Sequence, residues 1–157
     1  MKLKGETAST PIRRPIAGYV AMVLLALGVA SLSAFDGRNG RLHVIKNCAN
    51  FTGAAGSYCT IATSNVPEIK AGSKIYYTQA AGVPAGLLDS NVVLDAGNGN
   101  RTVGRCTLDL TTGEGLCTLS DGTGYFAGFK ATIDVSSAGG ADYRWDGTYK
   151  VSREGDR

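Results

Sequence analysis

The sequence is poor in the residue types that usually carry catalysis or metal binding. Its 157 residues include one histidine, one tryptophan and four cysteines. With His43 as the only imidazole, a Ser-His-Asp or Cys-His arrangement has no spare base. A zinc site would need cysteines about two to four residues apart, and the spacing here is much wider. The sequence therefore predicts no catalytic residue, no metal site and no cofactor.

Net charge is also absent once the first 33 residues are set aside. The formal charge of +3 equals the excess of the four basic residues in that segment over its single acid, Glu6. From Ala34 onward, 12 Lys or Arg residues face 12 Asp or Glu residues, well mixed. Such a surface lacks the basic footprint that a phosphate backbone requires, which excludes nucleic acid as a main partner.

Long apolar runs are missing except for one, from Ile16 to Ala34, which follows Lys2, Lys4, Arg13 and Arg14. A basic head, an apolar body and small residues at its end are typical of a secretory signal, so we interpret residues 1–33 as a signal peptide cleaved between 30 and 34. The alternative is an uncleaved anchor, because 19 residues nearly reach the roughly 20 that span a bilayer. In both cases residues 34–157 form one exported domain, secreted or periplasmic, with membrane contact only through an uncleaved leader.

The four cysteines fall into two pairs with equal steps, eleven residues each. An even number of cysteines behind an export signal predicts disulfides, and four cysteines allow three pairings. Local pairing, Cys48 with Cys59 and Cys106 with Cys117, is favoured because folding residues 106–119 about Thr111 and Thr112 puts Cys106 opposite Cys117, with the leucines on the same face as the cysteines.

Alternating side chains predict an all-β domain. Residues 129–136 and 142–152 alternate apolar and polar positions, and the glycine-rich 137–141 connects them. Asp146-Gly147 lies inside the second run, so Gly147 is expected within a strand and not in a turn. The preceding 121–128, DGTGYFAG, predicts a tight corner that is followed by a strand.

Six further strands with looser alternation bring the predicted number to eight, and no convincing amphipathic helix follows residue 34. Eight short antiparallel strands could form a sandwich or a barrel. The long last strand with its internal glycine favours closure into an eight-stranded antiparallel β-barrel, whose interior is filled by side chains or holds one small ligand. The six are 41–47, 57–63, 73–80, 90–95, 103–110 and 115–120.

The stretch CTLDLTTGEGLCTLSDGTGYFAGFKATIDV, followed by DYRWDGTY, resembles bacterial secreted proteins of the allene oxide cyclase barrel-like family, itself similar to plant dirigent proteins. The shared core is the glycine and aromatic pattern of residues 122–129, and YCTIATSN, KIYYTQAAG and LLDSNVVLD also fit. The resemblance spans residues 42–152.

The resemblance implies an eight-stranded antiparallel barrel, often trimeric in the plant members, with a cavity for a hydrophobic or phenolic molecule. The plant cyclase converts a fatty-acid epoxide to a cyclopentenone, and dirigent proteins direct the coupling of phenoxy radicals. No catalytic residue of either family matches a position here, and a shared fold does not imply a shared function.

The acids offer one candidate for an interior carboxylate. Asp89 is flanked by Leu87, Leu88, Val92 and Val93, which indicate burial nearby, and a buried acid could serve as a general acid. The alternative is a turn aspartate that caps backbone amides. His43 is expected on the exposed side of its strand, between Leu42 and Val44.

Residues 95–100, DAGNGN, superficially resemble a calcium loop. They lack the distal glutamate and the full spacing of one, so a plain hairpin loop is the better interpretation.

Four aromatic residues on the dry faces of the last two strands are the predicted ligand-binding residues: Phe129, Tyr143, Trp145 and Tyr149. They line a pocket if the barrel is hollow and are core if it is packed. The predicted function is an exported, disulfide-stabilised barrel that binds a small hydrophobic or phenolic ligand. The alternatives are a cyclase or isomerase acting on a reactive small molecule, and a structural envelope protein.

Overall fold

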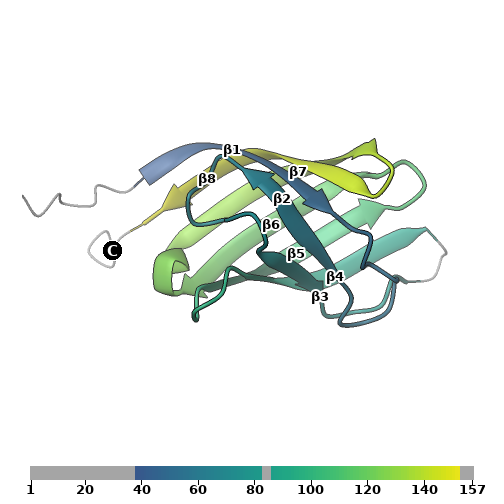
Figure 1. The fold of residues 1–157 in the computed structure, drawn as a ribbon, viewed down its shortest axis with the longest axis horizontal. Coiled ribbons are helices and arrows are strands. Elements are labelled where there is room, and N and C mark those ends of the chain that lie inside the picture. Colours follow the sequence, from purple (N-terminus) through teal and green to yellow (C-terminus); the bar gives the residue numbers. More distant parts are fainter. Residues whose placement is uncertain (1–37, 83–85, 153–157) are drawn as a thin grey trace, which may run out of the picture. The chain divides into compact units, whose positions relative to one another are not determined.

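Eight strands form because apolar and polar side chains alternate along each of them. The computed structural model describes residues 38–82 and 86–152, which belong to one compact unit (Figure 1). The strands are β1 (Arg38–Asn47), β2 (Tyr58–Ser64), β3 (Lys74–Tyr77), β4 (Leu87–Asp95), β5 (Arg101–Asp109), β6 (Glu114–Thr123), β7 (Phe129–Gly139) and β8 (Asp142–Val151). All eight predicted strands are confirmed. The predicted leader lies outside the described residues.

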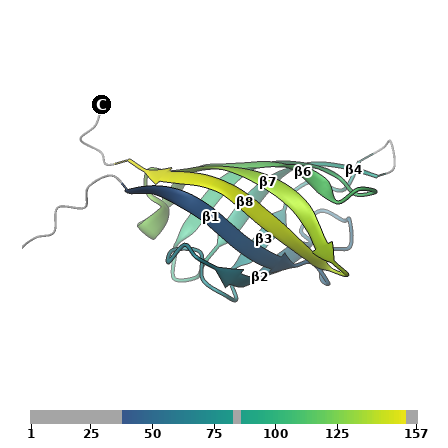
Figure 2. The same cartoon turned by 90° about the horizontal axis from the view of Figure 1, so that it is seen from above.

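The strands follow one another around a closed antiparallel barrel. The first and last strands complete it: β1 pairs with β8 from Arg38 opposite Val151 to Asn47 opposite Asp142, and Figure 2 shows these two strands side by side. Closure leaves no free sheet edge, which removes a common route to aggregation. The predicted eight-stranded antiparallel barrel is thus confirmed.

Alternate residues of every strand point into the barrel and form its core. On β7, Phe129, Ala131, Ile133 and Val135 are buried while the residues between them are exposed. A period of two in side-chain direction requires this pattern wherever one face of a sheet is dry. Burying these apolar side chains is the main stabilising contribution to the fold.

Gly147 lies inside β8, as predicted, opposite Leu42 on one side and Ile133 on the other. A Cβ atom at this position would lie 2.0 Å from the carbonyl oxygen of Thr132. The backbones of β7 and β8 therefore approach too closely for any other residue, and the glycine permits this curvature.

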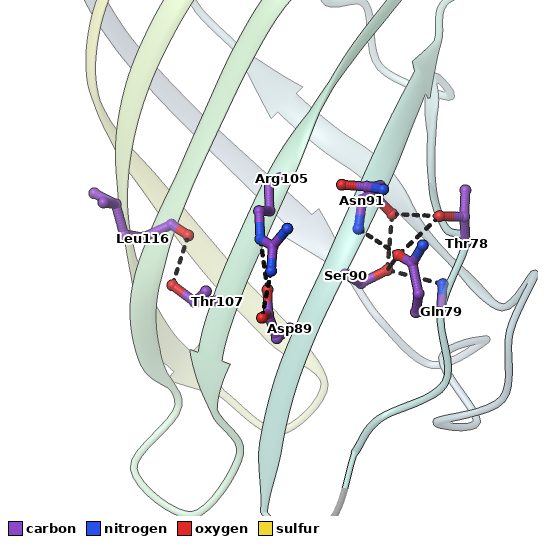
Figure 3. A network of polar contacts seen from close by, with 8 residues as sticks. All are labelled: Thr78, Gln79, Asp89, Ser90, Asn91, Arg105, Thr107 and Leu116. Atoms are coloured by element: carbon purple, nitrogen blue, oxygen red, sulfur yellow. Dashed lines mark hydrogen bonds and ion pairs between the residues drawn. The ribbon is translucent and has the colours of Figure 1, made fainter.

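The strand β3 ends at Tyr77, three residues earlier than predicted. Beyond it, the Thr78 amide still donates to the Asn91 carbonyl, but the side chain of Gln79 replaces the backbone by accepting from the Asn91 amide (Figure 3). The ladder with β4 is thus continued by a side chain, which a strand pattern cannot reveal.

The corner before β7 contains one turn of 3-10 helix, η1 (Gly124–Phe126), in the stretch predicted as a tight turn. Phe126 is fully buried, and its ring meets the ring of Phe129 edge to face at 5.3 Å between centroids. This pair, with Val66 and Ile69 from the β2–β3 connection, fills one end of the barrel. The phenylalanines therefore anchor the corner.

Both predicted disulfides are present, Cys48–Cys59 and Cys106–Cys117, and no described cysteine is free. Cys106 lies directly opposite Cys117 in the β5–β6 hairpin. Cys59, Cys106 and Cys117 are buried inside the barrel. The two bridges are consistent with an oxidising compartment.

Candidate functional site

A small cavity opens at the end of the barrel opposite the Phe126 corner. Its volume is about 160 Å³, and its rim includes Gly140 and Ala141, which are exposed. A cavity of about 150 Å³ engineered into another protein holds one benzene molecule. This pocket is therefore the size of a single six-membered ring. Its lining consists of Lys46, Cys48, Phe51, Cys59, Tyr77, Leu88, Leu108, Leu110, Gly140, Ala141 and Tyr143.

Lys46 is the one charged residue of this lining, and it is almost completely buried. It points inward because it continues the buried phase of β1 after Leu42 and Val44. Next to it the β1–β2 ladder contains a bulge, since Ile45 pairs with Thr63 and Lys46 with Ile61. Bulges are frequent beside functional sites, where they adjust the direction of a side chain.

The Lys46 amine is surrounded by aromatic groups. Its Nζ donates a hydrogen bond to the Tyr77 hydroxyl at 2.6 Å and lies 4.6 Å from the ring centroid of Trp145. The rings of Tyr77 and Tyr143 are 5.3 and 5.7 Å away. Side chains from β1, β3 and β8 therefore meet at one nitrogen atom.

No carboxylate compensates this amine, since none of the ion pairs found in residues 38–82 and 86–152 involves Lys46. Burial lowers the pKa of Lys46 from 10.5 to about 7. The nearby ring faces favour the ammonium by about 0.5–2 kcal/mol, which offsets only part of that desolvation. The nitrogen therefore exchanges between a cation and a neutral amine near physiological pH.

Tyr77 supplies a hydroxyl that keeps its proton. Burial raises its pKa, with a further contribution from Tyr143. The hydroxyl also lies 3.9 Å from the Sγ atom of Cys59, and the ring meets Phe51 edge to face at 5.0 Å. The disulfide and the loop after β1 thus hold Tyr77 beside the amine.

The four predicted ligand-binding residues divide between the two ends of the barrel. Tyr143 lines the pocket and Trp145, fully buried, lies against Lys46. Phe129 and Tyr149 stack at 5.8 Å next to Phe126 and lie outside the pocket lining. Their role as ligand contacts stays a prediction, whereas their packing closes the far end.

The indole Nε1 of Trp145 is buried and has no hydrogen-bond partner among the described residues. An unsatisfied buried donor costs about 1–3 kcal/mol, so this part of the interior is not optimised for stability alone.

Asp89 is neither interior nor a turn residue, contrary to both interpretations from the sequence. It lies on the outer face of β4, where its carboxylate accepts two hydrogen bonds from Arg105 at 2.8 and 2.6 Å (Figure 3). The burial inferred from its neighbours belongs to Leu88, Ser90 and Val92, which alternate with it.

His43 is exposed on β1, as predicted, and its Nδ1 lies 2.5 Å from an Asp146 carboxylate oxygen on β8. It points away from the interior, since Leu42 and Val44 beside it are buried. The loop 96–100 connects β4 to β5 as a hairpin, and Asp95 there accepts from the Gly97 amide and pairs with Arg101. These polar groups are thus separate from the pocket.

The important residue that sequence reasoning missed is Lys46. The signal was available, because His43 on the exposed side of its strand places residues 42, 44 and 46 on the other side. A lysine at an interior position of an apolar strand is costly to bury and so indicates a functional group.

Over 38–82 and 86–152, no group of three or more His, Cys, Asp or Glu residues is arranged to hold a metal ion. Within that part of the chain there is also no helix of the length and hydropathy needed to cross a membrane.

The chain matches no protein-family model, no curated protein and no solved structure.

Proposed function

We propose that this protein is an exported, disulfide-bonded β-barrel that binds a small phenolic compound with a single ring in the pocket that Lys46 lines. The observation that carries the proposal is the buried Lys46 side chain in the lining of a cavity of about 160 Å³ whose other lining side chains are mostly apolar or aromatic. Apolar pockets with a few converging polar groups are typical of small-molecule sites.

The polar groups suit a phenol in particular. The ring would pack among Leu88, Leu108 and Phe51, while its hydroxyl would donate to the neutral Lys46 nitrogen. The resemblance to dirigent-like barrels, whose plant members handle phenolic compounds, supports the same ligand class.

The cavity size bears on the cyclase alternative. Drug-sized ligands occupy pockets of about 300–1,000 Å³, and a long fatty-acid derivative needs comparable space. A volume of about 160 Å³ supports a one-ring ligand over a fatty-acid epoxide. The structural envelope alternative has no specific observation in its favour.

Titration with phenol, followed by the fluorescence of the single tryptophan, tests the proposal. Trp145 lies beside Lys46, so a ligand in the pocket should change its emission. Toluene is the matched ligand without a hydroxyl, and we expect it to bind about fivefold more weakly, which corresponds to one hydrogen bond of about 1 kcal/mol.

Two variants control for the location of binding. Ala141→Phe places a ring at the pocket rim and should abolish the response, whereas Ala127→Phe adds the same ring at an exposed position of the opposite end and should leave it unchanged. Absence of a saturable response to phenol in the unmodified protein, or equal responses of both variants, would overturn the proposal.

A further inference from the structure

The Lys46 nitrogen has chemistry that simple binding does not use. The Lys46 side chain lines the pocket, its nitrogen has the Tyr77 hydroxyl as hydrogen-bond partner, and no described carboxylate pairs with it. A methionine would fill the same space without the cost of burying an amine. An uncompensated amine next to an open cavity is a candidate nucleophile.

We propose that Lys46 forms an imine with a small aldehyde or ketone that carries one ring, bound in the same pocket. This proposal rests on the proposed binding function and names the class of ligand that the site would hold covalently. It assigns the Lys46 Nζ as the atom that forms the bond.

The reaction balances without an oxidant or reductant. The neutral amine attacks the carbonyl carbon, so a C–N bond forms while the C=O π electrons pass to the oxygen, which takes up a proton as the nitrogen loses one. The resulting carbinolamine loses its hydroxyl group, with a second nitrogen proton, as water. Amine and carbonyl compound thus give one imine and one water.

The surroundings of Nζ favour each stage of this reaction. The Tyr77 hydroxyl, 2.6 Å from the nitrogen, is placed to hydrogen-bond the oxygen that departs. The protonated imine carries a positive charge, and the Trp145 ring face at 4.6 Å would stabilise it. The low pKa of the buried amine keeps a large neutral fraction near pH 7.

Other lysines of the barrel lack this environment. Lys70, Lys130 and Lys150 are exposed. Lys74 lies over the ring of Tyr58, at 4.5 Å from its centroid, and is outside the lining of the Lys46 pocket. They provide internal references for reactivity within one molecule.

Reductive trapping of the full chain tests the inference. The protein is incubated at pH 7 with benzaldehyde and cyanoborohydride, which reduces an imine to a stable secondary amine, and the benzylated lysines are mapped by peptide mass spectrometry. We expect label at Lys46 at least about tenfold above that at Lys130. Lys46→Met should lose this label, and Lys130→Arg should keep it.

The mapping in unmodified protein makes the result independent of whether Lys46→Met folds. Label at Lys46 that phenol suppresses supports both proposals. Phenol binding without label at Lys46 overturns the imine while the binding function stands. Label equal at Lys46 and Lys130 overturns it as well. Absence of both phenol binding and label contradicts both proposals.

Discussion

Lys46 is the most deeply buried charged residue in the part of the chain that the structure describes. Burial moves its pKa from 10.5 to about 7, which corresponds to about 5 kcal/mol of destabilisation when the ammonium is present. The barrel therefore retains a costly group at the pocket and loses stability to do so, a trade typical of functional sites.

Replacing Lys46 by methionine should stabilise the barrel in a pH-dependent way. Between pH 7 and 10 the unfolded chain binds a proton at Lys46 that the native chain does not, so the stability of the unmodified protein rises with pH. We expect the stability gain from Lys46→Met to be about 4 kcal/mol larger at pH 6 than at pH 10, because over this range the amine loses its proton in the native chain and largely keeps it in the unfolded chain. Urea denaturation at several pH values measures it.

Lys130→Met, at an exposed position of β7, is the control and should show no such pH-dependent gain. Above about pH 10 the trend of the unmodified protein should reverse. The raised pKa of Tyr77 means that the unfolded chain ionises there first, and stability then falls with pH. A stability difference between Lys46→Met and the unmodified protein that is constant from pH 6 to 10 would contradict a titrating buried amine.

Asp89 and Arg105 form an ion pair with two hydrogen bonds, yet we expect it to contribute little to the stability of the folded barrel. The two side chains are 52% and 61% exposed, and exposed pairs contribute about 0–1 kcal/mol. Asp89→Asn should change the free energy of unfolding by less than about 1 kcal/mol and leave the phenol response unaltered. A lost phenol response with intact folding would show that the outer face takes part in binding.

At the scale of strands, close backbone approach explains why position 147 needs a glycine. A Cβ at Gly147 would meet the Thr132 carbonyl oxygen at 2.0 Å and the Ile133 Cα at 2.9 Å. Neither atom belongs to a flexible side chain, so β7 and β8 would have to separate. Gly147→Ala should cost about 3 kcal/mol or more, measured by chemical denaturation.

Gly82→Ala is the matched control, because its Cβ would be 3.9 Å from the nearest atom, the Leu87 carbonyl oxygen, and its backbone is not left-handed. It should change stability by less than about 1 kcal/mol. Similar losses for the two variants would mean that glycine flexibility, and not the contact with β7, explains the requirement at 147.

Strand patterns predicted most of the fold because side-chain direction in a strand has a fixed period of two. This local rule placed all eight strands and the Cys106–Cys117 register. It could not say which end of the barrel stays open, because that depends on the stagger of strands distant in the sequence. The sequence therefore groups Phe129 and Tyr149 with Tyr143, although the structure places them towards opposite ends of the barrel.

The same rule, applied to charged residues, would have found the site. Leu42, Val44 and Lys46 share one face of β1, which places a lysine at an interior position, whereas residue type alone draws attention to the acids and the single histidine. Asp89 failed as a candidate because residues adjacent in a strand point in opposite directions, so buried neighbours indicate an exposed residue. Composition identifies residue types that are rare in the sequence. The alternation along a strand identifies a charged residue that lies on the buried face.

At the scale of the whole molecule, the two disulfides have equal sequence spacing but differ in their position relative to the pocket. Each closes a loop of similar length and so should contribute about 3 kcal/mol in the chain-entropy model. Cys48 and Cys59 line the pocket, with Cys59 Sγ close to the Tyr77 hydroxyl, whereas Cys106 and Cys117 are absent from the pocket lining. One bridge is thus structural alone and the other also shapes the site.

This difference predicts that removing either disulfide lowers the free energy of unfolding by a similar amount, whereas only removal of Cys48–Cys59 weakens ligand binding. Cys106→Ala with Cys117→Ala should lower the unfolding free energy by about 3 kcal/mol and leave the phenol affinity of the folded protein within about twofold. Cys48→Ala with Cys59→Ala should cost a similar amount of stability and weaken phenol binding about tenfold or more, because the wall that holds Tyr77 is lost. Denaturant titration gives the first quantity and Trp145 fluorescence the second, in buffer where each variant is still folded. Equal affinities in the two double variants would separate the first bridge from the site and place ligand binding elsewhere in the barrel.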